Sequence, residues 1–225
     1  MIQNFVVATI KPWNIANFKK YFGNKKNYYL IQNKEKLTLD YLREINPRYI
    51  FFPHWSWLIP KKILSNYECV IFHAANLPYG RGGSPIQNMI LKGFTTTHIC
   101  ALKATAEIDA GPIFLRRTLS LTGSAEDIFR RLSHTVFFDM IPYIIKHEPM
   151  TTPQIGKVTL FKRRTPEESD IEPVKTLSDF YDFIRMLDAP KYPKAFLKTK
   201  RFRLEFSKVR LHKNKLTARV EVYEK

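Results

Sequence analysis

The sequence predicts an α/β fold with a doubly wound, mostly parallel sheet. Continuous apolar runs at 5–10, 49–52 and 69–72 are typical of strands that are buried on both faces. Segments with the apolar spacing of helices, such as 38–45, lie between these runs. Strands that alternate with helices favour a Rossmann-like arrangement, in which helices cover both faces and ligands bind beyond the carboxyl ends of the strands.

The expected elements follow one another up to about residue 150. Thr38 and Ser84 are expected to cap helices, and Pro85 suits the first position of the second helix. Ser124, with acids behind it, is a strong helix start, and the apolar residues that follow recur at near-helical spacing. In order, the expected elements are strand 5–10, helix 14–22, strand 28–31, helix 38–45, strand 49–52, helix 60–64, strand 69–72, helix 84–91, strand 94–104, strand 113–119 and helix 124–146.

These elements predict a catalytic domain over 1–150 and a small appendage over 151–225. The appendage begins with a linker rich in proline and charge, and its strands form a hairpin. A slip in the alternation of apolar residues near Ser207-Lys208 predicts a β-bulge. The appendage is expected to contain helix 177–187 and strands 202–211 and 216–222, with Lys213-Asn214 at the turn.

Composition limits the class of protein. The 225 residues carry a net charge of +17, and the last 35 hold twelve Lys and Arg against three acids, so nine of these charges lie there. Such a surface favours acidic partners. No apolar run is long enough to span a bilayer, and the start of the sequence lacks a secretory signal, so a cytoplasmic location is expected. Cys69 and Cys100 are expected to be reduced and structural.

Two short segments carry the residues best suited to chemistry. His73 follows a predicted core strand and begins a segment that continues through a glycine-rich loop to Gln87. Asp109 lies in the segment Glu107–Pro112. An imidazole and a carboxylate brought together can move a proton and stabilise a carbonyl oxygen as it becomes an oxyanion. The two segments therefore suggest proton transfer on a small group.

The pattern His-x(4)-Pro-x-x-Arg-Gly-x-x-Pro-Ile-Gln followed by Asp-Ala-Gly resembles the signature of the folate-dependent formyltransferases. The resemblance covers about residues 1–165. It implies the formyltransferase fold and N-formyltransferase activity with 10-formyltetrahydrofolate as the formyl donor. It also implies that His73 hydrogen-bonds the developing oxyanion or relays a proton, while Asp109 orients the imidazole and helps to remove a proton from the incoming amine.

One position departs from the family pattern. The family places an Asn two residues before the catalytic His, and this sequence has Ile71 there, which removes a hydrogen-bond donor to the oxyanion. His54, at the end of the neighbouring strand, is our candidate third catalytic residue in its place. A histidine at a strand end is equally typical of a structural residue.

The remaining candidate residues surround these strand ends. Trp55 can stack on a pterin ring, and small loop residues let ligands approach the backbone. No histidine shows metal-ligand spacing, so no metal is expected. The predicted folate-binding residues are Trp55, Ser56, Leu58, Arg81, Gly82, Ala104, Glu107 and Ile108, and the predicted acceptor-binding residues are Thr9, Lys11, Trp13, Asn76, Pro78 and Tyr79.

The acceptor is expected to be a nucleotide-linked amino sugar. The segments Phe52–Ser56 and Pro78–Gly83 look most like the short bacterial surface-sugar N-formyltransferases, including the pseudaminic acid type. The appendage offers about two strands, too few for the barrel domain that helps the methionyl-tRNA enzymes to hold tRNA. Nucleic acid is therefore disfavoured as a partner, no membrane insertion is expected, and the hairpin could form a dimer contact.

Other functions remain open at this stage. Formylation of methionyl-tRNA is the first alternative, because the basic hairpin could touch nucleic acid. A catalytically weakened relative that only binds nucleic acid is supported by Ile71 but disfavoured by the intact His73 and Asp109. Hydrolysis of formylfolate or formylation of a ribonucleotide would need the same fold with a different acceptor.

Overall fold

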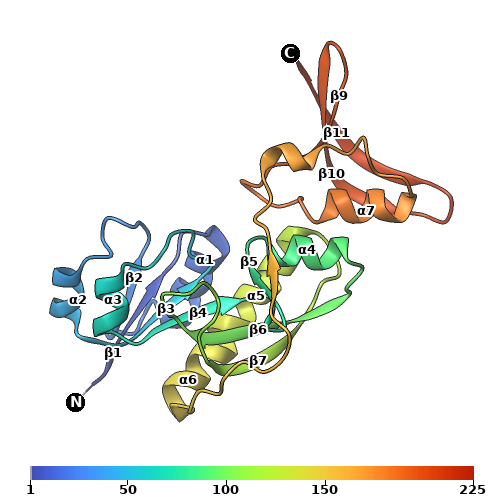
Figure 1. Cartoon of the computed structure of the whole chain (residues 1–225). Helices are drawn as coiled ribbons and strands as arrows, with labels where there is room; N and C mark the ends of the chain where they lie inside the picture. Colours follow the sequence, from blue (N-terminus) through green and yellow to red (C-terminus); the bar gives the residue numbers. More distant parts are fainter. Residues whose placement is uncertain (1) are drawn as a thin grey trace. The chain divides into compact units, whose positions relative to one another are not determined.

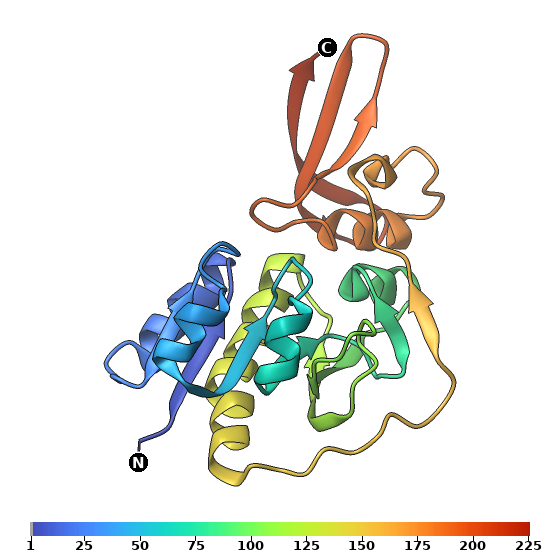
Figure 2. The same ribbon diagram turned by 60° about the vertical axis from the view of Figure 1, so that its left-hand side comes forward.

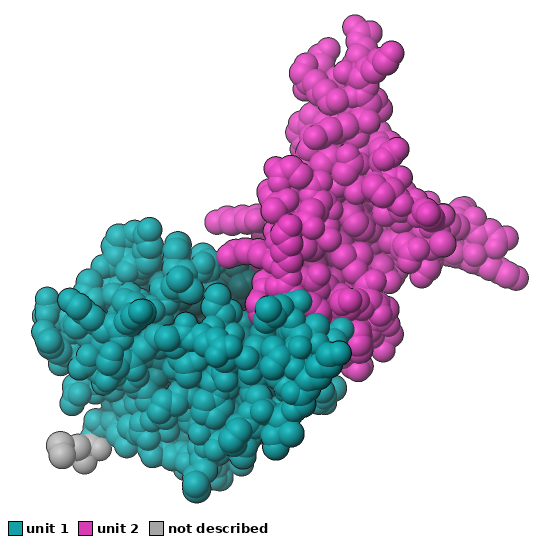
Figure 3. Space-filling model, in the orientation of Figure 1, with its two compact units in different colours: residues 1–81, 98–119, 130–160 teal, residues 82–97, 120–129, 161–225 magenta. Residues whose placement is uncertain are grey.

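The structure is a computed structural model that describes residues 2–225 (Figure 1). It contains two compact units, and each draws on separated stretches of the chain (Figure 3). Unit 1 holds the chain up to residue 81 together with 98–119 and 130–160, and unit 2 holds 82–97, 120–129 and 161–225. The division into a catalytic domain over 1–150 and an appendage over 151–225 remains a prediction.

The main sheet confirms the predicted fold class. Its strand order is β2-β1-β3-β4-β6-β7; β2, β1, β3 and β4 run parallel, and β6 is antiparallel to β4. The elements up to its fourth strand are β1 (Asn4–Ala8), α1 (Pro12–Phe22), β2 (Tyr28–Ile31), α2 (Leu39–Ile45), β3 (Pro47–Pro53), α3 (Lys61–Asn66) and β4 (Cys69–His73). The next are β5 (Tyr79–Gly82), α4 (Pro85–Leu91), β6 (Thr96–Lys103), β7 (Ile113–Ser120), α5 (Ala125–Thr135), the π-helix η1 (Val136–Met140), α6 (Ile141–His147) and β8 (Thr159–Phe161).

Side chains alternate between the two faces of the sheet, and helices pack against both faces. Val6 points to one face and forms a core cluster with Leu42 of α2 and Ile63 of α3. Phe5 points to the opposite face, where its ring contacts that of Tyr28, and Phe22 of α1 stacks on Tyr28 with ring centroids 4.4 Å apart. The predicted long helix after Ser124 is present as α5, η1 and α6 in succession, drawn yellow in Figure 2.

The C-terminal elements belong to unit 2 and form an antiparallel sheet of order β11-β10-β9. The predicted hairpin is present, and the register shifts between Ser207 and Arg210, with Lys208 at a φ of 50°, as the predicted bulge requires. The prediction of two strands is incomplete, because a four-residue third strand pairs with β10. The elements are η2 (Pro166–Ser169), α7 (Leu177–Arg185), β9 (Ala195–Lys198), β10 (Phe202–Leu211) and β11 (Leu216–Glu224).

Two predicted helix starts are wrong in detail. Ser84 makes no side-chain cap, because it has a φ of 49° and its hydroxyl instead accepts a hydrogen bond from Arg164 N. Helix α1 begins at Pro12 rather than Asn14, as the fixed φ of proline favours the first turn. Asn14 is instead completely buried. Within residues 2–225, no helix is both long enough and apolar enough to cross a membrane.

Candidate active site at the carboxyl edge of the sheet

Neighbouring parallel strands bring two of the predicted catalytic residues to the same edge of the sheet. The register pairs Pro53 of β3 with Phe72 of β4. The residues that follow are His54 and His73, and adjacent strands lie about 4.8 Å apart. The two histidines therefore leave the carboxyl ends of neighbouring strands together.

His73 and Asp109 are in contact, as the sequence predicts. His73 Nδ1 lies 3.3 Å from Asp109 Oδ2, and their side chains are 8% and 11% exposed. His73 ends β4, whereas Asp109 comes from the loop between β6 and β7. The fold thus brings a histidine and a carboxylate that are 36 residues apart in the sequence into a buried contact.

Both ring nitrogens of His73 face oxygen atoms. Nε2 lies 2.7 Å from the carbonyl oxygen of Gly80, which can only accept, so Nε2 carries a hydrogen and donates it. Nδ1 faces the Asp109 carboxyl group. A favourable contact there needs one proton between nitrogen and oxygen, held by either partner. The pair is therefore arranged to share and move a proton.

The loop that presents Asp109 has an unusual backbone. Asp109 has a φ of 52°, in the left-handed region that few residues other than glycine adopt. Gly111 lies so close to β6 that an added Cβ would be 1.8 Å from the carbonyl oxygen of Lys103. The Asp-Ala-Gly segment therefore supplies two things: the carboxylate of Asp109, and a glycine that lets the loop approach β6 closely.

Arg81 and Glu107, two predicted folate-binding residues, interact with each other. Arg81 Nη1 lies 3.2 Å from Glu107 Oε1, and the Arg81 side chain is 12% exposed although that of Glu107 is 77% exposed. Arg81 also donates to Gln154 Oε1. Sequence reasoning missed Gln154, since nothing near it in the chain marks it and only the fold brings it to the Asp109 loop.

A buried polar network holds the end of β3, where His54 begins the next loop. The hydroxyl of Thr9 donates to the carbonyl oxygen of Pro53 at 2.7 Å. The Asn14 amide nitrogen donates to the Thr9 hydroxyl at 2.8 Å and to the Pro53 carbonyl at 3.0 Å. His54 itself has a φ of 56°, and its ring centroid is 5.8 Å from that of Trp13. Thr9 and Trp13, predicted to bind the acceptor, are thus buried supports of the His54 turn.

The loop after β3 exposes apolar side chains. Trp55 packs edge-on against Trp57 with ring centroids 4.9 Å apart, and Leu58 is 81% exposed. The indole nitrogen of Trp55 is buried without a hydrogen-bond partner in the described part of the chain. An aromatic ligand with polar edges, such as a folate, would match this loop.

The other predicted residues differ in their surroundings and in their exposure. Gly82 faces backbone, since an added Cβ would be 2.5 Å from the carbonyl oxygen of Phe161. Lys11 Nζ lies 5.9 Å from the centre of the Trp13 ring. The exposed residues are Ser56, Asn76 and Ile108, the half-buried ones are Tyr79 and Ala104, and Pro78 is buried.

The cysteines do not contribute a nucleophile. Both are free and buried. Burial raises the pKa of Cys69 to about 12 and also raises the pKa of Cys100. A thiol with a raised pKa holds little thiolate at neutral pH. Within the described residues, no group of three or more His, Cys, Asp or Glu side chains gathers as a metal site would need.

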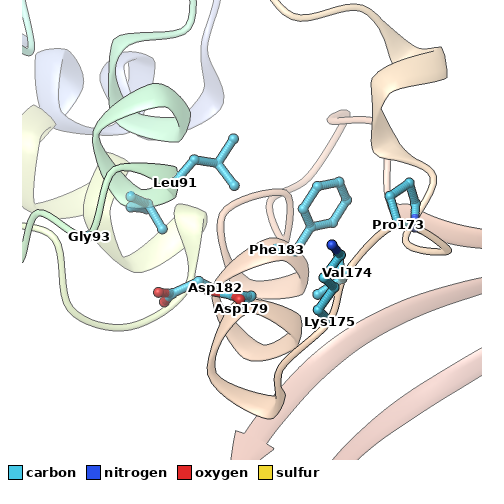
Figure 4. A pocket seen from close by; sticks show the side chains of 9 residues that line it. Leu91, Gly93, Pro173, Val174, Lys175, Asp179, Asp182 and Phe183 are labelled. Atoms are coloured by element: carbon cyan, nitrogen blue, oxygen red, sulfur yellow. The ribbon is translucent and has the colours of Figure 1, made fainter.

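A hollow of about 400 Å³ lies on unit 2 (Figure 4). Its lining includes Leu91, Phe183, Asp179 and Asp182 and contains none of the predicted site residues. Asp179 accepts a hydrogen bond from the Thr176 hydroxyl at the start of α7, and Asp182 pairs with an arginine of the same helix. Both carboxylates are engaged in interactions within α7 and its N-cap, so the hollow is not the candidate site.

Two family models match the chain. The model described as "Formyl transferase" matches residues 15–135, and the model described as "Methionyl-tRNA formyltransferase, C-terminal domain" matches residues 166–223. The first match contains the whole His73–Asp109 constellation.

Similar proteins point the same way. A curated methionyl-tRNA formyltransferase of Malacoplasma penetrans is 24% identical over 197 residues, or 84% of this chain and 62% of the relative. The structure of a methionyl-tRNA formyltransferase from Clostridium thermocellum is 48% identical, covers 100% of both chains and superimposes with a TM-score of 0.96. HypX from Aquifex aeolicus in complex with tetrahydrofolic acid shares the fold at 15% identity, with a TM-score of 0.73 over 94% of this chain and 38% of HypX.

These similarities correct the predicted acceptor. The amino-sugar prediction, with its surface-glycan setting, is wrong, because the 48% identical structure and the curated relatives are methionyl-tRNA formyltransferases. The similarities give no support to the prediction that disfavoured nucleic acid as a partner, because these relatives are methionyl-tRNA formyltransferases. The amino-sugar prediction depended partly on the two strands expected in the appendage, where the structure has three.

The chain spans about 60% of the length of the curated relatives it matches first. The family resemblance expected from the two segments is nevertheless confirmed, because the first family model covers more than half of the chain. The chain belongs to the formyl transferase family.

Proposed function

We propose that this chain transfers a formyl group from 10-formyltetrahydrofolate to the amine of methionyl-tRNA. Similarity to methionyl-tRNA formyltransferases along the whole chain supports this acceptor. The observation that carries the chemistry is the buried contact of 3.3 Å between His73 Nδ1 and Asp109 Oδ2. We keep residues 1–150 as the catalytic domain and 151–225 as its appendage.

The His73–Asp109 pair suits both needs of the reaction. The attacking amine must lose a proton, and the formyl oxygen must be stabilised as it gains negative charge. The Asp109 carboxylate accepts the amine proton as the bond between the amine nitrogen and the formyl carbon forms, and this proton passes to the tetrahydrofolate nitrogen as its bond to the formyl carbon breaks. His73 Nε2–H donates a hydrogen bond to the Gly80 carbonyl at 2.7 Å. In the reaction it donates to the formyl oxygen instead.

The loop after β3 is our proposed site for the formyl donor, which supplies the one-carbon group. Trp55 offers its buried indole N–H, and Leu58 offers apolar surface. The other folate-binding residues predicted from the sequence remain part of this proposal.

His54 is the proposed second donor to the formyl oxygen. Position 71, where the family pattern has Asn, holds an isoleucine that packs against both of its neighbouring core clusters. No side-chain hydrogen bond can come from there. His54 leaves β3 beside His73, and the Pro53 carbonyl before it is fixed by hydrogen bonds from Thr9 and Asn14.

We expect His54→Ala to lower kcat about 10²-fold, the usual effect of removing one oxyanion donor. The KM for methionyl-tRNA should change little, because the donor acts mainly on the transition state. Steady-state kinetics at saturating formyl donor measures both. His147→Ala, which changes an exposed histidine on α6, is the matched control. A kcat within a factor of three of the parent would make His54 structural.

The C-terminal sheet is the proposed contact for the tRNA backbone. Lys208 and Arg210 on β10 and Lys213 and Lys215 at the hairpin turn are all exposed. Cations spaced along a hairpin bind a phosphate backbone, and such binding weakens steeply with salt.

The acceptor decides between this function and its rivals. Purified chain with 10-formyltetrahydrofolate is assayed with methionyl-tRNA, with nucleotide-linked amino sugars and without acceptor. We expect formylmethionyl-tRNA to form and the other reactions to remain at background. Turnover without acceptor would indicate a hydrolase, and turnover with a sugar alone would overturn the proposal. Tight tRNA binding without turnover would support the second candidate, a binding protein, which Ile71 favours.

A further inference from the structure

Gln154 reaches the catalytic loop from a segment that the mechanism does not otherwise use. It lies between α6 and β8, in a stretch held to β7 by hydrogen bonds of 2.8 and 2.9 Å between the backbones of Thr152 and Ile113. Its side chain is half-buried and extends to the loop between β6 and β7. That loop presents Asp109.

All four hydrogen-bonding positions of the Gln154 amide are used. Nε2 donates to the carbonyl oxygen of Asp109 at 2.7 Å and to that of Gly111 at 2.8 Å. Oε1 accepts from Arg81 Nε at 3.1 Å and from Arg81 Nη2 at 3.0 Å. A side-chain amide has two N–H groups and two carbonyl lone pairs, so none is left over.

The partners also fix which way the amide points. A guanidinium only donates and a backbone carbonyl only accepts, so the oxygen must face Arg81 and the nitrogen must face the loop. Arg81 is itself held by its ion pair with Glu107. The two carbonyls that Gln154 binds flank Ala110, in the part of the loop where Asp109 takes its left-handed backbone.

We propose that Gln154 is a positioning residue that holds the Asp109 carboxylate against His73, an inference that rests on the proposed function. A left-handed backbone at a residue other than glycine persists only when its surroundings impose it. Gln154 supplies that constraint by binding the carbonyl of Asp109 itself. Without it, the carboxylate would sample positions away from Nδ1, and proton transfer would slow even though both groups were present.

The test replaces Gln154 by leucine and by glutamate. Leucine removes all four hydrogen bonds at similar size, while glutamate keeps the acceptor toward Arg81 and removes both donors toward the loop. We expect each variant to lower kcat about 10- to 100-fold and to change the pH dependence of kcat. The KM for methionyl-tRNA should stay within a factor of two. Ile155→Ala, at an 87% exposed neighbour, is the matched control and should keep full activity.

A second readout does not depend on turnover. The ¹⁵N NMR signals of the His73 ring report the hydrogen bonds of Nδ1 and Nε2. We expect Gln154→Leu to change the Nδ1 signal while thermal unfolding still shows a cooperative folded chain. Unchanged kcat, pH profile and Nδ1 signal would overturn the proposal for Gln154. Failure of the parent chain to formylate methionyl-tRNA would instead overturn the proposed function, and the NMR comparison would still test the positioning role.

Discussion

We expect Asp109→Asn to lower kcat for formyl transfer by about 10²- to 10⁴-fold, the range typical when a general base is removed. The amide is nearly the same size as the carboxylate but cannot take the amine proton. Asn also tolerates the left-handed backbone that position 109 requires, so the loop keeps its course. The measurement is kcat with methionyl-tRNA, together with the melting temperature.

The matched control is Asp40→Asn. The Asp40 side chain is 88% exposed at the start of α2, so this variant should keep full activity. Loss of kcat in Asp109→Asn at an unchanged melting temperature assigns the effect to the carboxylate. A kcat within threefold of the parent would instead make Asp109 a turn residue, a role that the sequence alone also allows.

Much of the fold could be predicted from the sequence, because the strands that carry the site are buried on both faces. The runs that became β1, β3 and β4 are almost wholly apolar, so their strand character needs no tertiary information. The pairing of His73 with Asp109 followed from the resemblance to a family signature. The structure confirms that the two side chains meet.

Features that depend on distant pairing could not be predicted. Strand β8 has three residues and exists because it pairs with β5, which lies about eighty residues earlier in a glycine-rich segment. Strand β9 is similarly short and gains its partner from β10. Gln154 follows the same rule, since its significance lies in the carbonyls that it reaches rather than in its neighbours along the chain.

The acceptor was wrongly predicted for a different reason. The motif around His73 concerns the formyl group, which is common to every acceptor, and it carries little information about the amine. The choice then depended on the likeness of two segments to the short sugar enzymes and on a strand count in the appendage, where β9 gave no sequence signal. The charge of the last 35 residues agrees with the proposed acceptor, because it describes a surface suited to polyanions.

We expect Gly111→Ala to abolish most formyl transfer and to destabilise the chain. The new Cβ would lie 1.8 Å from the carbonyl oxygen of Lys103, at the end of β6, and 3.2 Å from Thr105 Cγ2. Lys103 cannot move away easily, since its backbone N–H donates to the carbonyl of Pro112 at 2.9 Å. Overpacking of this kind costs about 1–3 kcal/mol, which corresponds to a fall in melting temperature of roughly 2–12 °C for a chain of this length. Thermal unfolding and kcat with methionyl-tRNA measure the two effects.

Gly93→Ala is the matched control, because no atom lies within 4 Å of its added Cβ. Its φ of 77° still costs the alanine about 1 kcal/mol, so a small loss of stability with full activity is expected. In Gly111→Ala the displaced backbone carries Asp109 away from His73, and both stability and kcat fall. Asp109→Asn changes kcat alone, so the two variants separate the shape of the loop from the chemistry of its carboxylate. Full activity in Gly111→Ala would show that the loop can leave β6 while Asp109 keeps its place, and the close approach would then have no part in catalysis.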